Sequence, residues 1–583
     1  MALYEQMKGV FTSTFYLSLS FFITVILVLF KLARSSKPKS NLNLPPSPPK
    51  LPFIGNLHQF GTLPHRSLRD LSLKYGDMMM LQLGQMQTPA LVVSSVDVLS
   101  EIIKTHDLTF SDRPQNTAAK ILLYGCADVG FALHGENWRH KRKICVLELL
   151  STKRVQAFGV IREEEVAELV NKLREASSNG ASYVNLSEMI MSTSNNIVCK
   201  CALGRKFEGD DDNRVKVLAR ETMIHLAAFT VRDYFPWLGW VDVVTGKIEK
   251  YKATAGTMDA LFDEAITERL RAKREGEHSK RKDFVDILLQ LQEDNMLGFE
   301  FTMNDVKVLV TLKVVKSLMK ISFVSLGHVC GRYRYNLGSI RMGYVRASEK
   351  TNRNEKGARR SGRIVGEKSN VEENDVNQMR YLKCVVKESI RLHPPTPLLA
   401  PRVTKSDVKL NGYDIPAKTT VYINAWAMQR DPKFWENPEE FLPERFENSE
   451  VDFKSQEDFQ FIPFGFGRGG CPGMNFAIAS IHYVLANLLY WFDWKLPTDA
   501  PDIDMNDMFG LVVSKKLPLL QLIKLSSVLS GVYSMASDSN SESICNKWWS
   551  CNLFFSLTPL YGFVATTIPS KSQPTLPPPT ITT

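Results

Sequence analysis

The sequence lacks paired cysteines. Its 583 residues include nine cysteines, and no CxxC pair is matched by a second such pair. Structural zinc sites of the ribbon and finger classes need such pairs, so a zinc site is not expected. The odd number and wide spacing also do not describe the disulfide framework of a small secreted domain. The cysteine pattern therefore favours a reducing compartment.

A nucleic-acid-binding pattern is also missing. The formal net charge is +10, but no arginine-rich stripe or basic motif with interleaved aromatic residues accompanies it. We therefore expect no nucleic-acid partner. The excess of positive charge instead favours an anionic membrane surface or an acidic protein partner.

A long apolar run near the start predicts a membrane anchor. Residues 10–30 are apolar apart from Ser, Thr and Tyr, and about 20 such residues can span a bilayer as a helix. A basic cluster follows, formed by Lys31, Arg34, Lys37 and Lys39, and such clusters stay on the cytosolic side. The alternative is a cleaved signal peptide, whose apolar core is usually shorter, about 7–15 residues. We predict an uncleaved transmembrane anchor in residues 1–31.

Residues 32–60 form a basic and proline-rich hinge in this interpretation. The run from Leu44 to Pro52 contains five prolines, which cannot continue a helix and make a stiff, extended spacer. The segment is either a plain linker or a spacer that sets how the catalytic body sits over the membrane.

The body of the chain, residues 61–525, is predicted to be mainly α-helical with small β-sheets. Helical periodicity dominates from about Leu68 to Leu318, for example over residues 158–176 and 254–291. Short β-branched pieces at residues 91–93 and 419–422 predict strands.

The strongest chemical signal is the glycine-rich loop from Pro463 to Gly473, which contains Cys471. Glycines let the backbone approach a flat ligand closely, and an aromatic side chain such as Phe464 can pack over the sulfur. The residues from Asn475 to Leu489 predict a helix, so Cys471 lies near its electropositive N-terminal end. That position favours the thiolate form of the cysteine.

This loop resembles the haem-binding signature of the cytochrome P-450 superfamily, in its plant microsomal A-type clan. The resemblance implies a haem cofactor with Cys471 as the axial thiolate ligand of the iron. Glu388 and Arg391 match the family's E-x-x-R motif, and one helical turn apart they can pair with each other and with Arg445. In the family these three residues are structural.

Further residues match the family's haem-binding positions. Trp138 and Arg142 resemble its W-x-x-x-R element, whose arginine meets a haem propionate through a charge-assisted bond. Arg402 occupies the place of a second propionate arginine, and Arg468 lies in the cysteine loop. The resemblance covers roughly residues 1–310 and 362–520.

The resemblance implies a monooxygenase that turns RH, O₂ and two electrons into ROH and water. The electrons would come from NADPH through a membrane-bound NADPH-cytochrome P-450 reductase, whose acidic face suits a basic surface. Expected substrates are lipophilic small molecules, either terpenoids or other plant specialised metabolites. The expected location is the endoplasmic-reticulum membrane, with one span and a cytosolic body.

The sequence departs from the family pattern at the haem loop and at the C-terminus. The arginine that normally precedes the cysteine by two residues is replaced by Gly469, so one propionate contact is in question. Residues 526–583 form a Ser/Thr/Pro-rich tail with a composition typical of disorder. We interpret this tail as a read-through product or a misassigned last exon.

A third departure removes the oxygen-activation helix. Between Thr311 and Gly362 the family's G-G-x-D-T-T motif is absent. A reading frame shifted one base forward lets the codons of residues 330–346 spell V-G-G-T-D-T-T-S-V-V-L-E-W-A-M-S-E. The catalytic acid and threonine would then be encoded across Arg334, Tyr335 and Asn336, and no intact catalytic pair remains. We interpret residues 311–362 as a stretch of intron followed by a frameshifted segment.

Two alternatives to a working monooxygenase therefore stay open. This polypeptide is a non-catalytic product that lacks the oxygen-activation helix, or it is a reductase-independent rearrangement enzyme, since some family members that isomerise peroxides lack the acid–threonine pair. The shifted reading frame still spells the acid–threonine motif, which argues against the rearrangement enzyme.

Overall fold

A computed structural model describes residues 16–25, 42–85, 89–178, 184–207, 210–276, 281–294, 298–311, 371–455, 457–495, 507–508, 510, 512–515 and 520–525. All of them belong to the unit Met1–Ser526. The predicted tail and the segment 312–362 lie outside the described residues. Residues 16–25 of the predicted anchor are helical, and among the described residues no helix is both long and apolar enough to cross a membrane.

The main sheet contains both strands that the sequence predicts. Its strand order is β1-β2-β7-β4, with the bounds Met78–Leu81, Ala90–Val93, Thr420–Ile423 and Arg402–Val403. β1 and β2 are antiparallel, whereas β2 runs parallel to β7 with Leu91 opposite Val421. Arg402 on β4 also lies opposite Val421, so the sheet brings a predicted haem-site arginine beside the N-terminal strands.

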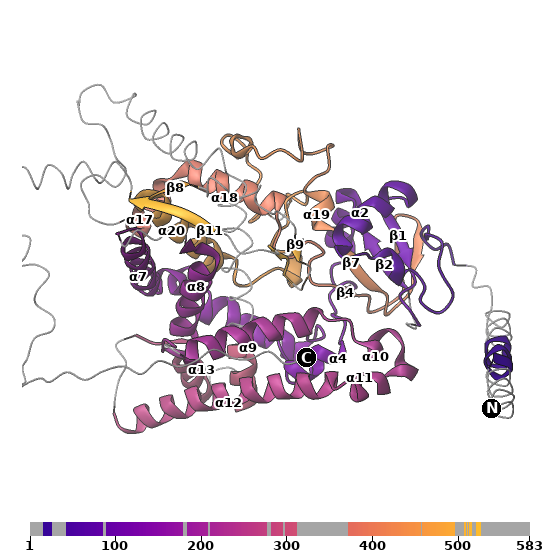
Figure 1. Cartoon of the computed structure of the whole chain (residues 1–583), viewed down its shortest axis with the longest axis horizontal. Helices are drawn as coiled ribbons and strands as arrows, with labels where there is room; N and C mark the ends of the chain where they lie inside the picture. Colours follow the sequence, from indigo (N-terminus) through magenta and orange to yellow (C-terminus); the bar gives the residue numbers. More distant parts are fainter. Residues whose placement is uncertain are drawn as a thin grey trace, which may run out of the picture. The chain divides into compact units, whose positions relative to one another are not determined.

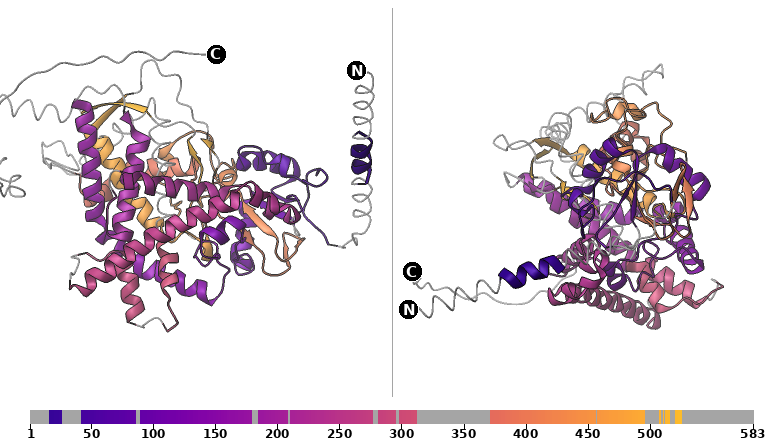
Figure 2. Two further views of the ribbon diagram at one scale, coloured as in Figure 1. Left: turned by 60° about the horizontal axis from the view of Figure 1, so that its bottom comes forward. Right: turned by 90° about the vertical axis from the view of Figure 1, so that its right-hand side faces the viewer.

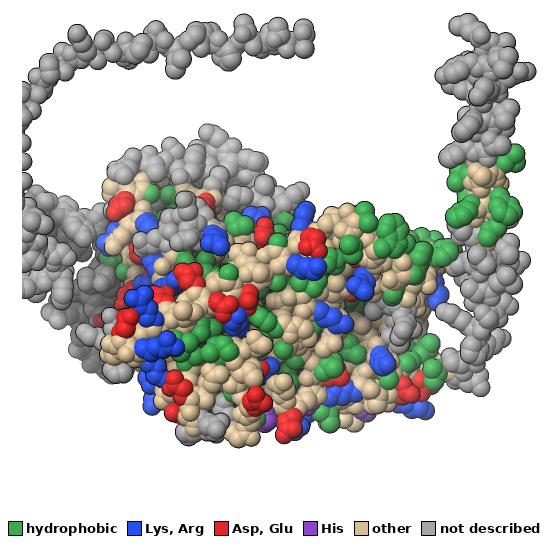
Figure 3. All heavy atoms as spheres, turned by 90° about the horizontal axis from the view of Figure 1, so that it is seen from below, with side chains coloured by type: hydrophobic (Ala, Val, Ile, Leu, Met, Phe, Trp, Pro, Cys, Tyr) green, Lys and Arg blue, Asp and Glu red, His purple; other side chains and the backbone are tan. Residues whose placement is uncertain are grey.

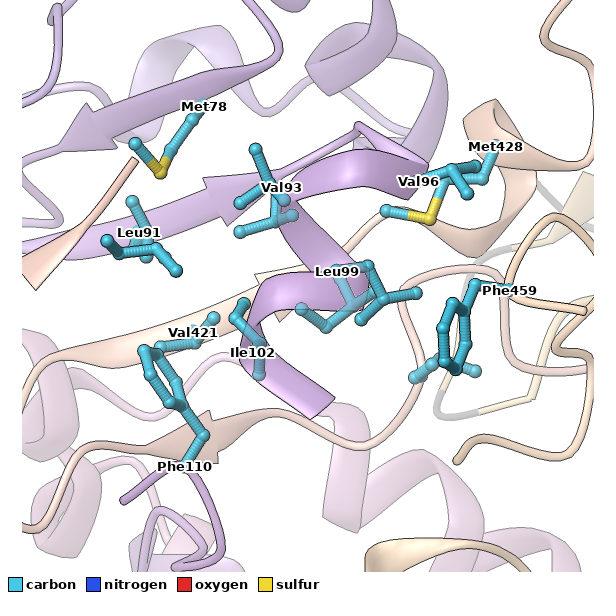
Figure 4. Packing of buried hydrophobic residues seen from close by; sticks show 14 of the residues in the cluster. Met78, Leu91, Val93, Val96, Leu99, Ile102, Phe110, Val421, Met428 and Phe459 are labelled. Atoms are coloured by element: carbon cyan, nitrogen blue, oxygen red, sulfur yellow. The ribbon is translucent and has the colours of Figure 1, made fainter. Parts of the chain in front are cut away.

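All four residues of β2 are buried. Because successive side chains of a strand point to opposite faces, both faces of β2 are covered. Leu91 and Val93 belong to one buried cluster with residues of helix α3 (Val96–His106) and with Phe459, which precedes the cysteine loop (Figure 4). Ala90 and Val92 pack on the other face against α2 (Pro64–Tyr75). The hydroxyl of Ser95 accepts bonds from the first-turn amides and fixes where α3 begins.

Helices form most of the remaining described body (Figures 1 and 2). Helix α7 packs against both α8 and α20, and α12 packs against α4, α9 and α11. The helices not yet given bounds are α4 (Thr117–Leu122), α5 (Glu136–Lys143), α6 (Thr152–Ala157), α7 (Gly159–Ser178), α8 (Leu186–Leu203), α9 (Asp210–Ala227), α10 (Val231–Tyr234), α11 (Trp240–Val244), α12 (Lys247–Arg274), α13 (Phe284–Glu293), α17 (Glu373–Gln378), α18 (Arg380–Leu392), α19 (Ala425–Met428) and α20 (Met474–Trp491).

The predicted helices over residues 158–176 and 475–489 correspond to α7 and α20. The predicted run over residues 254–291 is wrong as a single helix, because α12 ends at Arg274 and α13 begins at Phe284. Gly276 follows α12 with a φ of 75°, a left-handed conformation that favours glycine. Asp283 then starts α13 with a capping box completed by Asp286.

Smaller sheets and short turns of helix complete the described elements. The order β3-β11-β8 forms a three-stranded sheet, and β5-β6 and β9-β10 are two-stranded. Their bounds are β3 Val184–Asn185, β5 Val408–Leu410, β6 Tyr413–Ile415, β8 Phe492–Lys495, β9 Asp507–Met508, β10 Ser514–Lys515 and β11 Leu520–Leu525. The short turns are η1 (Leu57–Gln59), η2 (Ile144–Leu149), η3 (Pro236–Leu238), η4 (Pro443–Phe446) and η5 (Gly467–Gly469).

Positive and negative side chains alternate on the face seen in Figure 3. On α12 they form near-neighbour ion pairs, such as Lys252 with Glu249 at 2.9 Å and Arg271 with Glu275 at 2.8 Å. Exposed pairs of this kind contribute little to stability, roughly 0.3–0.5 kcal/mol each. The fold is therefore held by its buried clusters rather than by this surface.

Candidate functional site

The cysteine loop is a tightly hydrogen-bonded turn that ends at α20. The Cys471 amide donates to the Phe464 carbonyl at 2.9 Å, and the Gly470 amide donates to the Gly467 carbonyl at 3.1 Å. Gly467 has a φ of 55°, and a Cβ there would lie 2.7 Å from the Asp107 carboxylate. Glycine is therefore required at this position by both conformation and space.

Cys471 differs from the other described cysteines in its exposure. It is half-buried, whereas Cys126, Cys145, Cys199, Cys201 and Cys384 are buried. Burial raises the pKa of the Cys126 thiol to about 12, which keeps that sulfur protonated. The Cys471 sulfur instead accepts a bond from the Gly473 amide at 3.3 Å and lies just before the first residue of α20. Both features favour a thiolate.

Aromatic side chains surround the loop. Phe464 and Phe466 are both 7% exposed, and the Phe464 ring lies 5.2 Å from the ring of Phe453. The guanidinium of Arg402 lies 3.9 Å from the centroid of the Phe466 ring. The loop thus has an apolar side and a cationic side next to the sulfur, as a flat, apolar ligand with anionic groups would need.

Several arginines converge on the loop backbone. Buried Arg402 donates to the Phe466 carbonyl at 2.9 Å and to the Phe110 carbonyl at 3.2 Å. Arg113 donates to the Gly469 carbonyl at 3.2 Å and to the Pro401 carbonyl at 2.9 Å. The arrangement joins β4, the segment after α3 and the cysteine loop through guanidinium groups.

One carboxylate, that of Asp107, pairs with two of these arginines. Its Oδ1 lies 3.4 Å from Nη1 of Arg402, and its Oδ2 lies 3.1 Å from Nη1 of Arg468. The Asp107 side chain is 14% exposed and that of Arg468 is 52% exposed. Arg468 is therefore the outer member of the group and Arg402 the inner one.

Arg142 of α5 belongs to the same electrostatic group. Burial lowers its pKa, and the neighbouring sulfurs of Cys471 and Cys145 raise it. Its guanidinium also lies 5.9 Å from the centroid of the Trp138 ring, and the Trp138 indole donates to the Val129 carbonyl at 3.0 Å. The W-x-x-x-R element thus faces the cysteine loop. We call Arg113, Arg142, Arg402 and Arg468 the arginine cluster.

The arginine cluster is under-neutralised. Burial, with repulsion from Arg402 and Arg142, lowers the pKa of Arg113 to about 9 against the opposing attraction of Asp128. Burial lowers the pKa of Arg402 to about 10, against the opposing attraction of Asp107. A shifted arginine is unusual, because its ordinary pKa exceeds 12. An anion placed here would relieve both the burial cost and the repulsion, so the residues fit a ligand that carries carboxylates.

Gly469 lies inside this group. A Cβ at Gly469 would be 2.8 Å from Nη2 of Arg113 and 2.9 Å from Nη2 of Arg402. The small residue therefore leaves room for these two guanidinium groups. Arg113 was not identified from the sequence, since Asp112-Arg113-Pro114 has no local feature that distinguishes it from a surface arginine. Asp107 was missed for the same reason.

The E-x-x-R residues form a separate network. Both carboxylate oxygens of Glu388 accept from Arg391, at 2.7 and 2.8 Å, and Arg445 donates to the same carboxylate at 3.1 Å. Arg391 also donates to three backbone carbonyls, those of Gln429, Pro438 and Glu440. The structure thus brings Cys471, Phe464 and the arginine cluster together, and it groups Glu388, Arg391 and Arg445 elsewhere. Arg334 and Tyr335 lie outside the described residues.

Comparison with known proteins now identifies the family. A family model described as Cytochrome P450 matches residues 45–315 and 360–522. The chain belongs to the cytochrome P450 family. Among its relatives, phenylacetaldehyde oxime monooxygenase of Prunus mume is 48% identical over 85% of this chain and 92% of that protein. Cytochrome P450 71A1 of Persea americana is 45% identical over 86% of this chain and 98% of that protein.

Solved structures show the same fold. A zebra fish cytochrome P450 with abiraterone matches with a TM-score of 0.64 at 21% identity, covering 80% of this chain and all of that one. The predicted fold class, mainly α with small sheets, is confirmed. The chain is a plant cytochrome P450 of the A-type clan and a haem-thiolate monooxygenase by family, with haem as its cofactor. The family match omits residues 316–359.

Proposed function

We propose that the gene encodes an anchored monooxygenase that hydroxylates a lipophilic plant specialised metabolite, a terpenoid or another class. Cys471 ligates the haem iron, and Arg113, Arg142, Arg402 and Trp138 hold the propionate edge, with Phe464 against the sulfur. When bound, haem supplies the activation of O₂, and a cysteine thiolate ligand favours O–O cleavage. The observation that carries the proposal is the under-neutralised arginine cluster beside a half-buried cysteine.

The substrate class is supported by relatives that act on plant metabolites. One is named for the oxime of phenylacetaldehyde, and another, 41% identical over 86% of this chain, is named strychnine-11-hydroxylase. The electrons come from NADPH through a membrane-bound reductase, attracted by the positive net charge of the chain. Residues 1–31 anchor the enzyme in the endoplasmic-reticulum membrane with the body cytosolic.

We further propose that the polypeptide with residues 311–362 as printed is non-catalytic. Support comes from the family match, which stops at residue 315 and resumes at residue 360, and from the motif that the shifted frame restores. Without the acid–threonine pair, the chain lacks the residues that move protons during oxygen activation. The intact enzyme would contain the shifted reading in this segment.

Replacement of Thr311–Gly362 by the one-base-shifted reading tests this proposal. With NADPH, reductase and a panel of lipophilic plant metabolites, the repaired chain should consume O₂ and form hydroxylated product, whereas the printed chain should form none. Cys471→Ser in the repaired chain is the control and should abolish product. Comparable turnover by the printed chain would overturn the account of this segment, and turnover by the Cys471→Ser variant would overturn the assignment of the ligand.

A further inference from the structure

A lysine on helix α5 is buried and has no role in the proposal above. Lys141 lies next to Arg142, and its side chain is 2% exposed. A buried ammonium group is costly unless it is paired and hydrogen-bonded. Its Nζ lies 2.7 Å from Oδ1 of Asp305 and donates to the Ala127 carbonyl at 3.0 Å. The lysine therefore joins α5 to two other parts of the chain.

The first partner, Asp305, fixes the start of the helix at residues 303–311. Its Oδ2 accepts from the amide and the hydroxyl of Thr302, at 2.9 and 2.8 Å. The Asp305 amide donates back to the Thr302 hydroxyl at 3.3 Å, which completes a reciprocal cap. One carboxylate thus begins this helix with one oxygen and holds Lys141 with the other.

The second partner, Ala127, belongs to a loop that α5 holds at two points. The Trp138 indole donates to Val129, two residues further along. Trp138 and Lys141 are three residues apart, so they share one face of α5. Asp128 between the two acceptors is buried, and its carboxylate accepts from the amides of Gly130 and Phe131. The loop is therefore a rigid contact surface for α5.

Helix α5 depends on such contacts for its position. It has eight residues, begins after Gly135, which has no side chain to cap it, and continues directly into the six residues of η2. Helices this short are unstable on their own and are held by tertiary packing. The contacts that hold α5 consequently decide where Trp138 and Arg142 stand.

We propose that Lys141 is a positioning residue for the haem edge. Through Asp305 and Ala127 it locks α5 to the start of the helix at residues 303–311, and it thereby places Arg142 beside the cysteine loop. This inference rests on the proposed haem site. It predicts that one ion pair couples the start of the helix at residues 303–311 to the binding of haem propionates.

The chain offers a matched control on the helix at residues 303–311. Lys307, 12% exposed, pairs with Asp259 at 2.9 Å and with Asp263 at 2.6 Å. Both partners lie on α12, away from α5. Loss of Lys307 therefore removes a largely buried ion pair from residues 303–311 and leaves the contact with α5 in place. A general loss of stability would follow from either lysine, but a loss of haem-edge geometry only from Lys141.

The test compares Lys141→Met, Lys307→Met and the conservative variant Lys141→Arg in the full chain. Hydrogen exchange of peptides from residues 136–149 is measured beside the hemin affinity from titration. Lys141→Met should speed exchange of these peptides and weaken hemin binding, each roughly tenfold, as expected for a lost bond to a charged group. Lys307→Met should change both less than about twofold, and Lys141→Arg, which keeps a cation beside Asp305, should show at most half of each loss.

Equal effects of the two methionine variants would overturn the inference, as would unchanged exchange and affinity in Lys141→Met. The exchange measurement needs no haem, so it decides the role of Lys141 in holding α5 even where hemin binds weakly. Hemin binding that is unaffected by Cys471→Ser would instead count against the proposed haem site. The two failures are therefore distinguishable.

Discussion

Two groups of arginines in this protein differ in how their buried charge is neutralised. In the E-x-x-R network, Arg391 is fully buried and donates to Glu388 and to three backbone carbonyls. In the arginine cluster, Arg402 is also buried, but its pKa and that of Arg113 are lowered by burial. The first group is complete within the protein. The second is short of negative charge.

The difference separates a structural centre from a binding site. A guanidinium group has five N–H donors, and the network around Arg391 uses them on protein acceptors. Around the cysteine loop, Asp107 alone pairs with both Arg402 and Arg468. A fold gains nothing from gathering cations that repel each other. We infer that the haem propionates supply the missing negative charge.

The largest expected effect comes from breaking the complete network. Arg391→Leu leaves the Glu388 carboxylate buried with fewer partners, which should cost about 3–5 kcal/mol of the free energy of unfolding. Urea unfolding of the haem-free chain measures the loss. Arg402→Leu in the same assay should cost far less, because it also removes a repulsion with Arg113. Equal losses would erase the distinction between the two groups.

Haem affinity should depend on the arginine cluster. Arg402→Gln and Arg113→Gln should each weaken hemin binding roughly tenfold or more, since each removes a charge-assisted bond of about 1.5–3 kcal/mol. Arg468→Gln should have the smallest effect of the three, because its side chain is exposed and already paired with Asp107. Titration with hemin measures all three. Affinity unchanged in both Arg113→Gln and Arg402→Gln would contradict the assignment of the cluster.

Arginine at Gly469 tests whether Arg113 has taken over a family position. In the parent chain, Gly469→Arg crowds Arg113 and Arg402, so the rate of haem loss should change little. Combined with Arg113→Gln, the new arginine has room and should slow haem loss by roughly tenfold relative to Arg113→Gln alone. If Gly469→Arg changes the rate of haem loss by the same factor with and without Arg113→Gln, the two positions act independently.

The sequence was sufficient to predict the features that depend on local motifs. The residues from Pro463 to Gly473 predicted the cysteine loop, and the short β-branched pieces predicted the strands at Leu91 and Val421. It was insufficient where contacts join distant residues. Arg113 and Gly469 are 356 positions apart, and Lys141 meets Asp305 across the fold. Local patterns do not encode such pairs.

A pH effect is expected from His482 on α20. Burial, with the positive charges of Lys383, Lys454 and Lys387, lowers its pKa to about 3. The unfolded chain binds this proton near pH 6.5, so stability should fall as the pH drops from about 6.5 towards 3. His482→Gln should flatten this part of the pH profile of unfolding. A profile with the same slope in both proteins would show that the half-buried His482 does not stay neutral in the folded chain.

The most direct test of the central claim is the absorption spectrum of the reduced, carbon-monoxide-bound protein. The repaired chain should show the red-shifted Soret band of thiolate-ligated haem, and Cys471→Ser should lose it. The red-shifted band should also weaken in proportion to haem occupancy in Arg113→Gln and Arg402→Gln. A red-shifted band that persists in Cys471→Ser would contradict the claim that this cysteine, beside the arginine cluster, holds the haem.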